Sequence, residues 1–181
     1  MIPALNDRGL LPLGRYLTTL DEIEARFAPQ GSGRRSKVWR EFINALAELR
    51  SAVPVCAIWI SGSFLTDENS PDDLDVVFFL DSRDCVIARN DERARKIVGV
   101  FASNKVKEAF RWAVDSNVVE WVSDTCGEHS SYTVDKYLET RGYWDDFWQR
   151  IRHGEKHGPT VRQDALPERG YVEVIIDGFK S

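Results

Sequence analysis

Residues 53–81, VPVCAIWISGSFLTDENSPDDLDVVFFLD, decide the fold expected for this chain. The apolar run at 55–60 predicts a central strand covered on both faces, and the run at 74–80 predicts a second strand. Because side chains on a strand alternate between its two faces, Asp73 and Asp75 should point the same way, with Cα atoms about 7 Å apart. The stretch therefore predicts two carboxylates at one strand end, facing a Gly-Ser turn of the neighbouring strand.

The composition is that of a soluble globular protein. The chain has 181 residues, of which 43% are hydrophobic and 29% charged, enough for one domain with a substantial core. Its net charge is −5 without a large basic block, so general DNA binding is not expected. No apolar run approaches the ~18 residues of a membrane span, and the N-terminus lacks the apolar core of a signal peptide. We therefore expect a cytoplasmic protein without a membrane segment.

The cysteines indicate the redox environment. Cys56, Cys85 and Cys126 are odd in number and have no C-x-x-C spacing. This pattern is typical of a reduced intracellular protein without a zinc site. Cys56 lies within an apolar strand, so we interpret it as a free buried thiol.

Glycine, proline and helix-capping residues divide the rest of the chain. Residues 1–35 are expected to form an N-terminal arm and a short helix that starts after Thr19, and residues 36–181 the main domain. Apolar periodicity then predicts helices at 37–52, at 91–109 with a break near 103 and at 135–152 with a kink near 142, and strands at 111–122 and 171–176. This order of elements indicates a small α/β or α+β sheet domain.

The Gly-Ser turn and the carboxylate pair together suit nucleotide chemistry. Gly62 has no Cβ, so its backbone can approach a phosphate closely. The hydroxyl of Ser63 and nearby N–H groups could hold the terminal phosphates. Asp73 and Asp75 would bind Mg²⁺, which prefers oxygen ligands and keeps positions for water and substrate. With a third carboxylate they would hold two Mg²⁺ ions about 3.5–4 Å apart.

These residues also carry a resemblance to a known superfamily. GSF at 62–64 and PDDLDV at 71–76 resemble the signature of polymerase-beta-like nucleotidyltransferases, which include small toxin–antitoxin enzymes, aminoglycoside adenylyltransferases and tRNA-tailing enzymes. The resemblance implies a mixed β-sheet of the nucleotidyltransferase type, flanked by helices. It also implies Mg²⁺-dependent transfer of a nucleoside monophosphate from an NTP, such as ATP, to an acceptor hydroxyl.

A narrower resemblance covers nearly the whole chain. The arm LNDRGLLPLG at 5–14 and the final strand after Gly170 are similar to an uncharacterised bacterial family of small nucleotidyltransferase-like proteins. Because the activity of that family is largely unassigned, this likeness bears on the fold more than on the reaction.

The superfamily places its third carboxylate on the next strand of the sheet. The resemblance implies that Asp115 takes this role, completing the metal site and helping to deprotonate the acceptor, with Glu120 as the alternative. A turn position for Asp115, beside Ser116 and Asn117, is the competing interpretation.

Two classes of function remain open at this point. The first is an active nucleotidyltransferase, whose acceptor could be protein, RNA or a small molecule, in a toxin–antitoxin or defence module. The second is a non-catalytic protein of the same fold, acting as an antitoxin, as a partner of a cognate toxin, or as a nucleotide-binding sensor.

Overall fold

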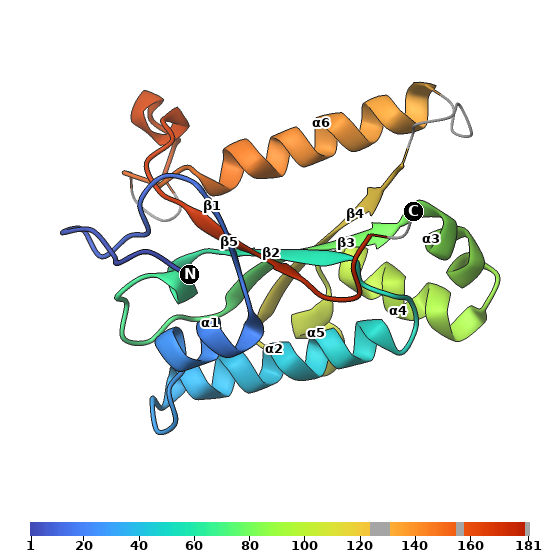
Figure 1. The fold of residues 1–181 in the computed structure, drawn as a ribbon, viewed down its shortest axis with the longest axis horizontal. Coiled ribbons are helices and arrows are strands. Elements are labelled where there is room, and N and C mark those ends of the chain that lie inside the picture. Colours follow the sequence, from blue (N-terminus) through green and yellow to red (C-terminus); the bar gives the residue numbers. More distant parts are fainter. Residues whose placement is uncertain (124–130, 155–157, 180–181) are drawn as a thin grey trace.

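The computed structural model describes residues 1–123, 131–154 and 158–179. Five strands form one mixed sheet in the order β1-β5-β2-β3-β4, and helices lie on both of its faces (Figure 1). The strands are β1 (Arg15–Thr18), β2 (Ala57–Ser61), β3 (Leu74–Asp81), β4 (Val114–Trp121) and β5 (Tyr171–Ile175). The α+β class and the mixed sheet flanked by helices that the sequence predicted are confirmed.

Six α-helices and two short 3₁₀ segments complete the described part of the chain. The helices are α1 (Leu20–Phe27), α2 (Arg34–Arg50), α3 (Ser82–Arg89), α4 (Glu92–Ala102), α5 (Val106–Phe110) and α6 (Ser131–Trp148), and the 3₁₀ segments are η1 (Ser63–Leu65) and η2 (Arg162–Ala165). The break expected near residue 103 separates α4 from α5. Near residue 142, in contrast, α6 continues without interruption.

The sheet separates two apolar layers. Ile58, Ile60 and Phe78 face the larger core, which is closed by α1 to α5. Trp59 and Phe79 point to the opposite face, which α6 covers (Figure 1). β2 is buried along its whole length, as predicted for a central strand. Since odd-numbered residues of β2 and β3 share the α6 face, Asp75 also lies on that face.

Polar side-chain caps mark the start of three helices, α1, α3 and α4. The Thr19 hydroxyl accepts a hydrogen bond from the N–H of Glu22 at 3.2 Å, as the capping pattern in the sequence predicted. Asp91 caps α4 in the same way. Asp81 is both the last residue of β3 and the cap of α3, a helix that the sequence analysis missed. The strand passes directly into this short helix, and Asp81, a preferred N-cap residue, is the local signal that marks the boundary.

The N-terminal segment belongs to the same sheet and core. β1 pairs in parallel with β5, and Ile2 and Leu11 are buried in the larger core. α2 runs across residue 35, where the sequence analysis placed the boundary between the arm and the main domain. Cys126 lies outside the described residues. None of the helices in the described ranges combines the length and the apolar character needed to cross a membrane.

The first turn of α2 holds the loop that leads into β3. Arg35 is buried, and its guanidinium donates hydrogen bonds at 2.8–3.1 Å to four main-chain carbonyls, those of Phe27, Phe64, Thr66 and Glu68. Arg34 donates to the carbonyls of Pro71 and Asp72. Two consecutive arginines thereby fix the chain on its path from the Gly-Ser turn to Asp73.

We expect Arg35→Met to lower the free energy of unfolding by about 3 kcal/mol, because it leaves several buried carbonyls without a donor. Arg35→Lys should recover only part of this loss, since one ammonium cannot span four carbonyls as a guanidinium fork does. Urea denaturation measures both changes, with Arg40→Met on the exposed side of α2 as the control. A methionine variant as stable as the control would show that the loop does not depend on Arg35.

Candidate functional site

The register of β3 brings three aspartates to one place. Asp73 immediately precedes β3, and Asp75 is its second residue. Asp75 pairs with Ser61 of β2 on one side and with Asp115 of β4 on the other. Adjacent strands are about 4.8 Å apart, so the carboxylates of Asp75 and Asp115 are neighbours on the α6 face. We call Asp73, Asp75 and Asp115 the acidic cluster.

Glu120, the alternative third carboxylate, lies elsewhere. It is five residues beyond Asp115 on β4, so it faces the opposite side of the sheet, about 17 Å along the strand. There it forms an ion pair with Arg89 of α3. Asp115 is in a regular strand rather than a turn, and the structure places it, not Glu120, beside Asp75.

Gly62 immediately follows β2 and lies against the acidic cluster. Its φ is +80°, a left-handed conformation that favours glycine. A Cβ built on Gly62 would overlap the Asp75 carboxylate. Ser63 follows as the first residue of η1, so the Gly-Ser turn lies directly beside Asp75 as the sequence predicted.

We expect Gly62→Ala to destabilise the protein by about 2–3 kcal/mol. Alanine is strained at a positive φ, and its Cβ would also overlap the Asp75 carboxylate. Gly99→Ala is the matched control: Gly99 lies inside α4 with open space around the position of its Cβ, so alanine should be neutral or stabilising there. Thermal denaturation compares the two. Equal stabilities for the two variants would contradict the close approach at Gly62.

Three groups that the sequence analysis did not identify complete the site. The Lys107 ammonium, from α5, forms an ion pair with Asp73. Asn104 accepts a hydrogen bond from the N–H of Ser116 at 3.0 Å, and its side chain also bonds Asp115. Arg169, which donates to the carbonyl of Trp148, acts electrostatically on Asp75. These groups come from a helical turn and a loop, where no local pattern relates them to the strand residues.

The electrostatics show an excess of negative charge. Burial, together with the neighbouring carboxylates of Asp73 and Asp115, raises the pKa of Asp75 to about 6, against the opposing effects of Arg169 and Lys107. Burial also raises the pKa of Asp115, opposed by Lys107. Burial acts to lower the pKa of Lys107, but its hydrogen bond to Asp73 and the charges of all three carboxylates outweigh that effect and raise it.

The raised pKa of Asp75 predicts a pH-dependent cost to stability. The carboxyl binds its proton more tightly in the folded than in the unfolded chain, whose reference pKa is 3.8, so stability should fall as the pH rises from about 4 to about 6. We expect Asp75→Asn to unfold at higher urea than the natural chain near pH 7.5, by about 2 kcal/mol in metal-free buffer. This advantage should vanish towards about pH 4.

Asp135→Asn makes the same substitution on the exposed side of α6 and is the control for this measurement. An Asp75→Asn variant that is less stable than the natural chain at neutral pH would mean that the ionised carboxylate is favourably paired in the folded state.

The acidic cluster fits a divalent cation by its chemistry. Carboxylate oxygens are the ligands that Mg²⁺ prefers, and the raised pKa of Asp75 shows charge that a cation would neutralise. Among the described residues, no three histidine, cysteine or acidic side chains already converge closely enough to enclose an ion. Lys107 holds one oxygen of Asp73 in this arrangement, so binding of an ion would require the side chains to adjust.

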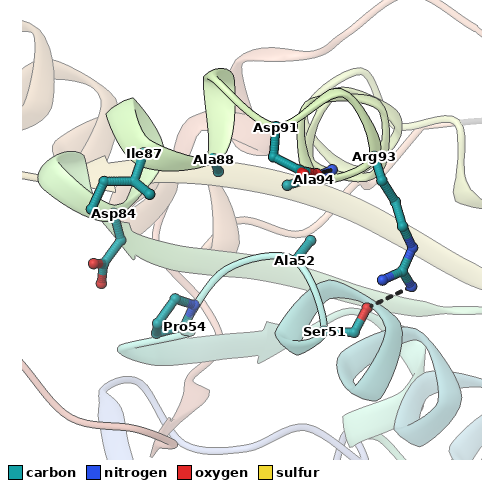
Figure 2. Close-up of a pocket in the computed structure, with 9 residues that line it drawn as sticks. All are labelled: Ser51, Ala52, Pro54, Asp84, Ile87, Ala88, Asp91, Arg93 and Ala94. Carbon is teal, nitrogen blue, oxygen red and sulfur yellow. Dashed lines mark hydrogen bonds between the residues drawn. The ribbon is translucent and has the colours of Figure 1, made fainter.

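Two cavities lie outside the acidic cluster, and each contains an arginine that is paired with a glutamate. A cavity of about 330 Å³ lies between α3, α4 and the turn that follows α2 (Figure 2). Arg93 donates a hydrogen bond to the Ser51 hydroxyl there, at 3.1 Å, and forms an ion pair with Glu48. A second cavity, of about 400 Å³, lies between β1, β2 and α6. Its Arg15 pairs with Glu173, at 3.5 Å.

The fold and the acidic cluster define an α+β protein with three carboxylates at the edge of two neighbouring strands, beside a Gly-Ser turn. Comparison with known families matches residues 3–175 to a family of unknown function, DUF6932, and the chain belongs to that family. Neither the search of curated proteins nor the search of solved structures found a match.

Proposed function

We propose that this protein is a Mg²⁺-dependent nucleotidyltransferase that transfers a nucleoside monophosphate from an NTP to an acceptor hydroxyl. The observation that carries the proposal is the register that sets Asp75 between Ser61 and Asp115, with Gly62 against the Asp75 carboxylate. Three acidic groups, a glycine turn and nearby cations are the parts that phosphoryl transfer requires.

Each residue of the site has a role in this proposal. Asp73 and Asp75 hold the metal, and Asp115 completes its ligand set. One or two Mg²⁺ ions bound there would neutralise the triphosphate and the leaving pyrophosphate. The N–H groups at Gly62 and the hydroxyl of Ser63 hold the terminal phosphates, because the missing Cβ allows the close approach.

The proton of the acceptor hydroxyl goes to Asp115. Burial raises the pKa of Asp115 above that of an ordinary aspartate, which makes its carboxylate a better base. The acceptor oxygen then attacks the α-phosphorus, and the bond to pyrophosphate breaks. Asn104 bonds the Asp115 side chain and would orient it towards the acceptor.

The acceptor is a protein, an RNA or a small molecule, and we favour a macromolecule in a toxin–antitoxin or defence module of the bacterial cytoplasm. A net charge of −5 makes an extended nucleic-acid surface unfavourable. A short RNA end or a protein hydroxyl would need no such surface.

A non-catalytic role, as an antitoxin or a nucleotide sensor, is the second candidate. The ion pair between Lys107 and Asp73 favours it, because an ammonium group neutralises part of the acidic cluster without any metal. Such a protein would use the same scaffold to bind a nucleotide or a cognate protein without turnover.

Calorimetric titration with each of the four NTPs and Mg²⁺ tests the proposal. We expect binding of at least one NTP that requires Mg²⁺ and falls by more than about tenfold in Asp73→Ala and Asp75→Ala. Glu120→Ala, on the opposite face of the sheet, is the control and should bind normally. Transfer of label from the bound NTP into cell extract then identifies the acceptor.

Asp115→Ala should abolish transfer without unfolding the chain. Normal transfer by Asp115→Ala would remove that residue from the mechanism. Binding without transfer in the natural chain would favour the nucleotide sensor. No binding of any NTP by folded protein would contradict both nucleotide roles and direct the search to protein partners.

A further inference from the structure

Lys107 is presented to the acidic cluster by an unusual piece of backbone. α5 is only five residues long, and it lies between two residues with positive φ, Asn104 at 52° and Arg111 at 63°. The N–H of Arg111 donates a hydrogen bond to the carbonyl of Lys107 at 3.2 Å, which ends the helix. The segment that supplies Asn104 to Asp115 therefore also supplies Lys107 to Asp73.

The charges make Lys107 the counterion of the whole cluster. Its ammonium is paired directly with Asp73, and its electrostatic interactions extend to Asp75 and Asp115. The Lys107 side chain is 45% exposed, whereas that of Asp73 is 24% exposed. Lys107 thus approaches the carboxylates from the solvent side, on a flexible four-carbon stem that can move away without disturbing the sheet.

We propose that Lys107 is a built-in counterion that a divalent cation must displace from Asp73 when it binds the acidic cluster. This inference rests on the proposed function, because it takes the cluster as the metal site. An ammonium and a doubly charged ion within a few ångströms of each other repel strongly at a partly buried site. Lys107 therefore weakens metal binding and confines the ion-free carboxylates to one arrangement.

Binding of Mn²⁺ alone, without nucleotide, tests this role. Free Mn²⁺ is measured by electron paramagnetic resonance during titration, and the shift in melting temperature with Mn²⁺ provides a second readout. We expect Lys107→Met to bind Mn²⁺ about tenfold more tightly than the natural chain, because a positive charge next to the ion is removed.

Lys105→Met is the matched control, since it removes the same charge two residues away, from an exposed side chain that makes no capping hydrogen bond to α5. It should leave the Mn²⁺ affinity within about twofold of the natural chain, because an exposed charge is largely screened. Lys107→Arg keeps the charge and should retain weak binding. If Lys107→Met does not fold, Lys107→Gln gives the same comparison, because its amide can donate to Asp73 without a charge.

The outcomes separate this inference from the proposed function. Unchanged or weaker Mn²⁺ binding by folded Lys107→Met, with measurable binding by the natural chain, would overturn the counterion role and leave the metal site standing. Binding by Lys107→Met alone would support the counterion role in its strongest form. No Mn²⁺ binding by any folded variant would overturn the metal site and, with it, the role of Lys107.

Discussion

The candidate site depends on the register of β3 against its two neighbours. Because β3 pairs with β2 in antiparallel and with β4 in parallel orientation, Asp75 lies in one row with Ser61 and Asp115. A shift of the β3 register by one residue would turn Asp75 towards the larger core, where burial among apolar side chains strongly disfavours an ionised carboxylate. Burial of Ile58, Ile60 and Phe78 on that side therefore holds the carboxylates on the other.

This arrangement costs stability at the site. The raised pKa of Asp75 means that its ionised form is disfavoured in the folded chain. The rest of the fold offsets this cost through an apolar layer on each face of the sheet. Groups held in an unfavourable state by their surroundings are typical of functional sites. That pattern supports a functional rather than a purely structural interpretation of the acidic cluster.

Arginine and lysine side chains connect the site to the helices around it. Arg35 fixes the main chain between Gly62 and Asp73 from α2, while Lys107 reaches the carboxylate of Asp73 from α5. The Arg35 contacts are buried and made to backbone carbonyls, so they fix the path of the main chain. The Lys107 contact is half-exposed and made to a carboxylate, so it balances the charge of Asp73 and can be replaced by another cation. One basic residue thus positions the site, and the other balances it.

The sequence by itself determined the two central strands and the helix starts at Thr19 and Asp91, because strand alternation and capping are local rules. It missed α3, which follows β3 without a turn, and left open whether Asp115 or Glu120 joins the pair. Only the tertiary structure decided for Asp115 and brought Lys107, Asn104 and Arg169 to the cluster. Those contacts join segments far apart in the chain, and their register is set by the packing of the whole sheet, which no local pattern encodes.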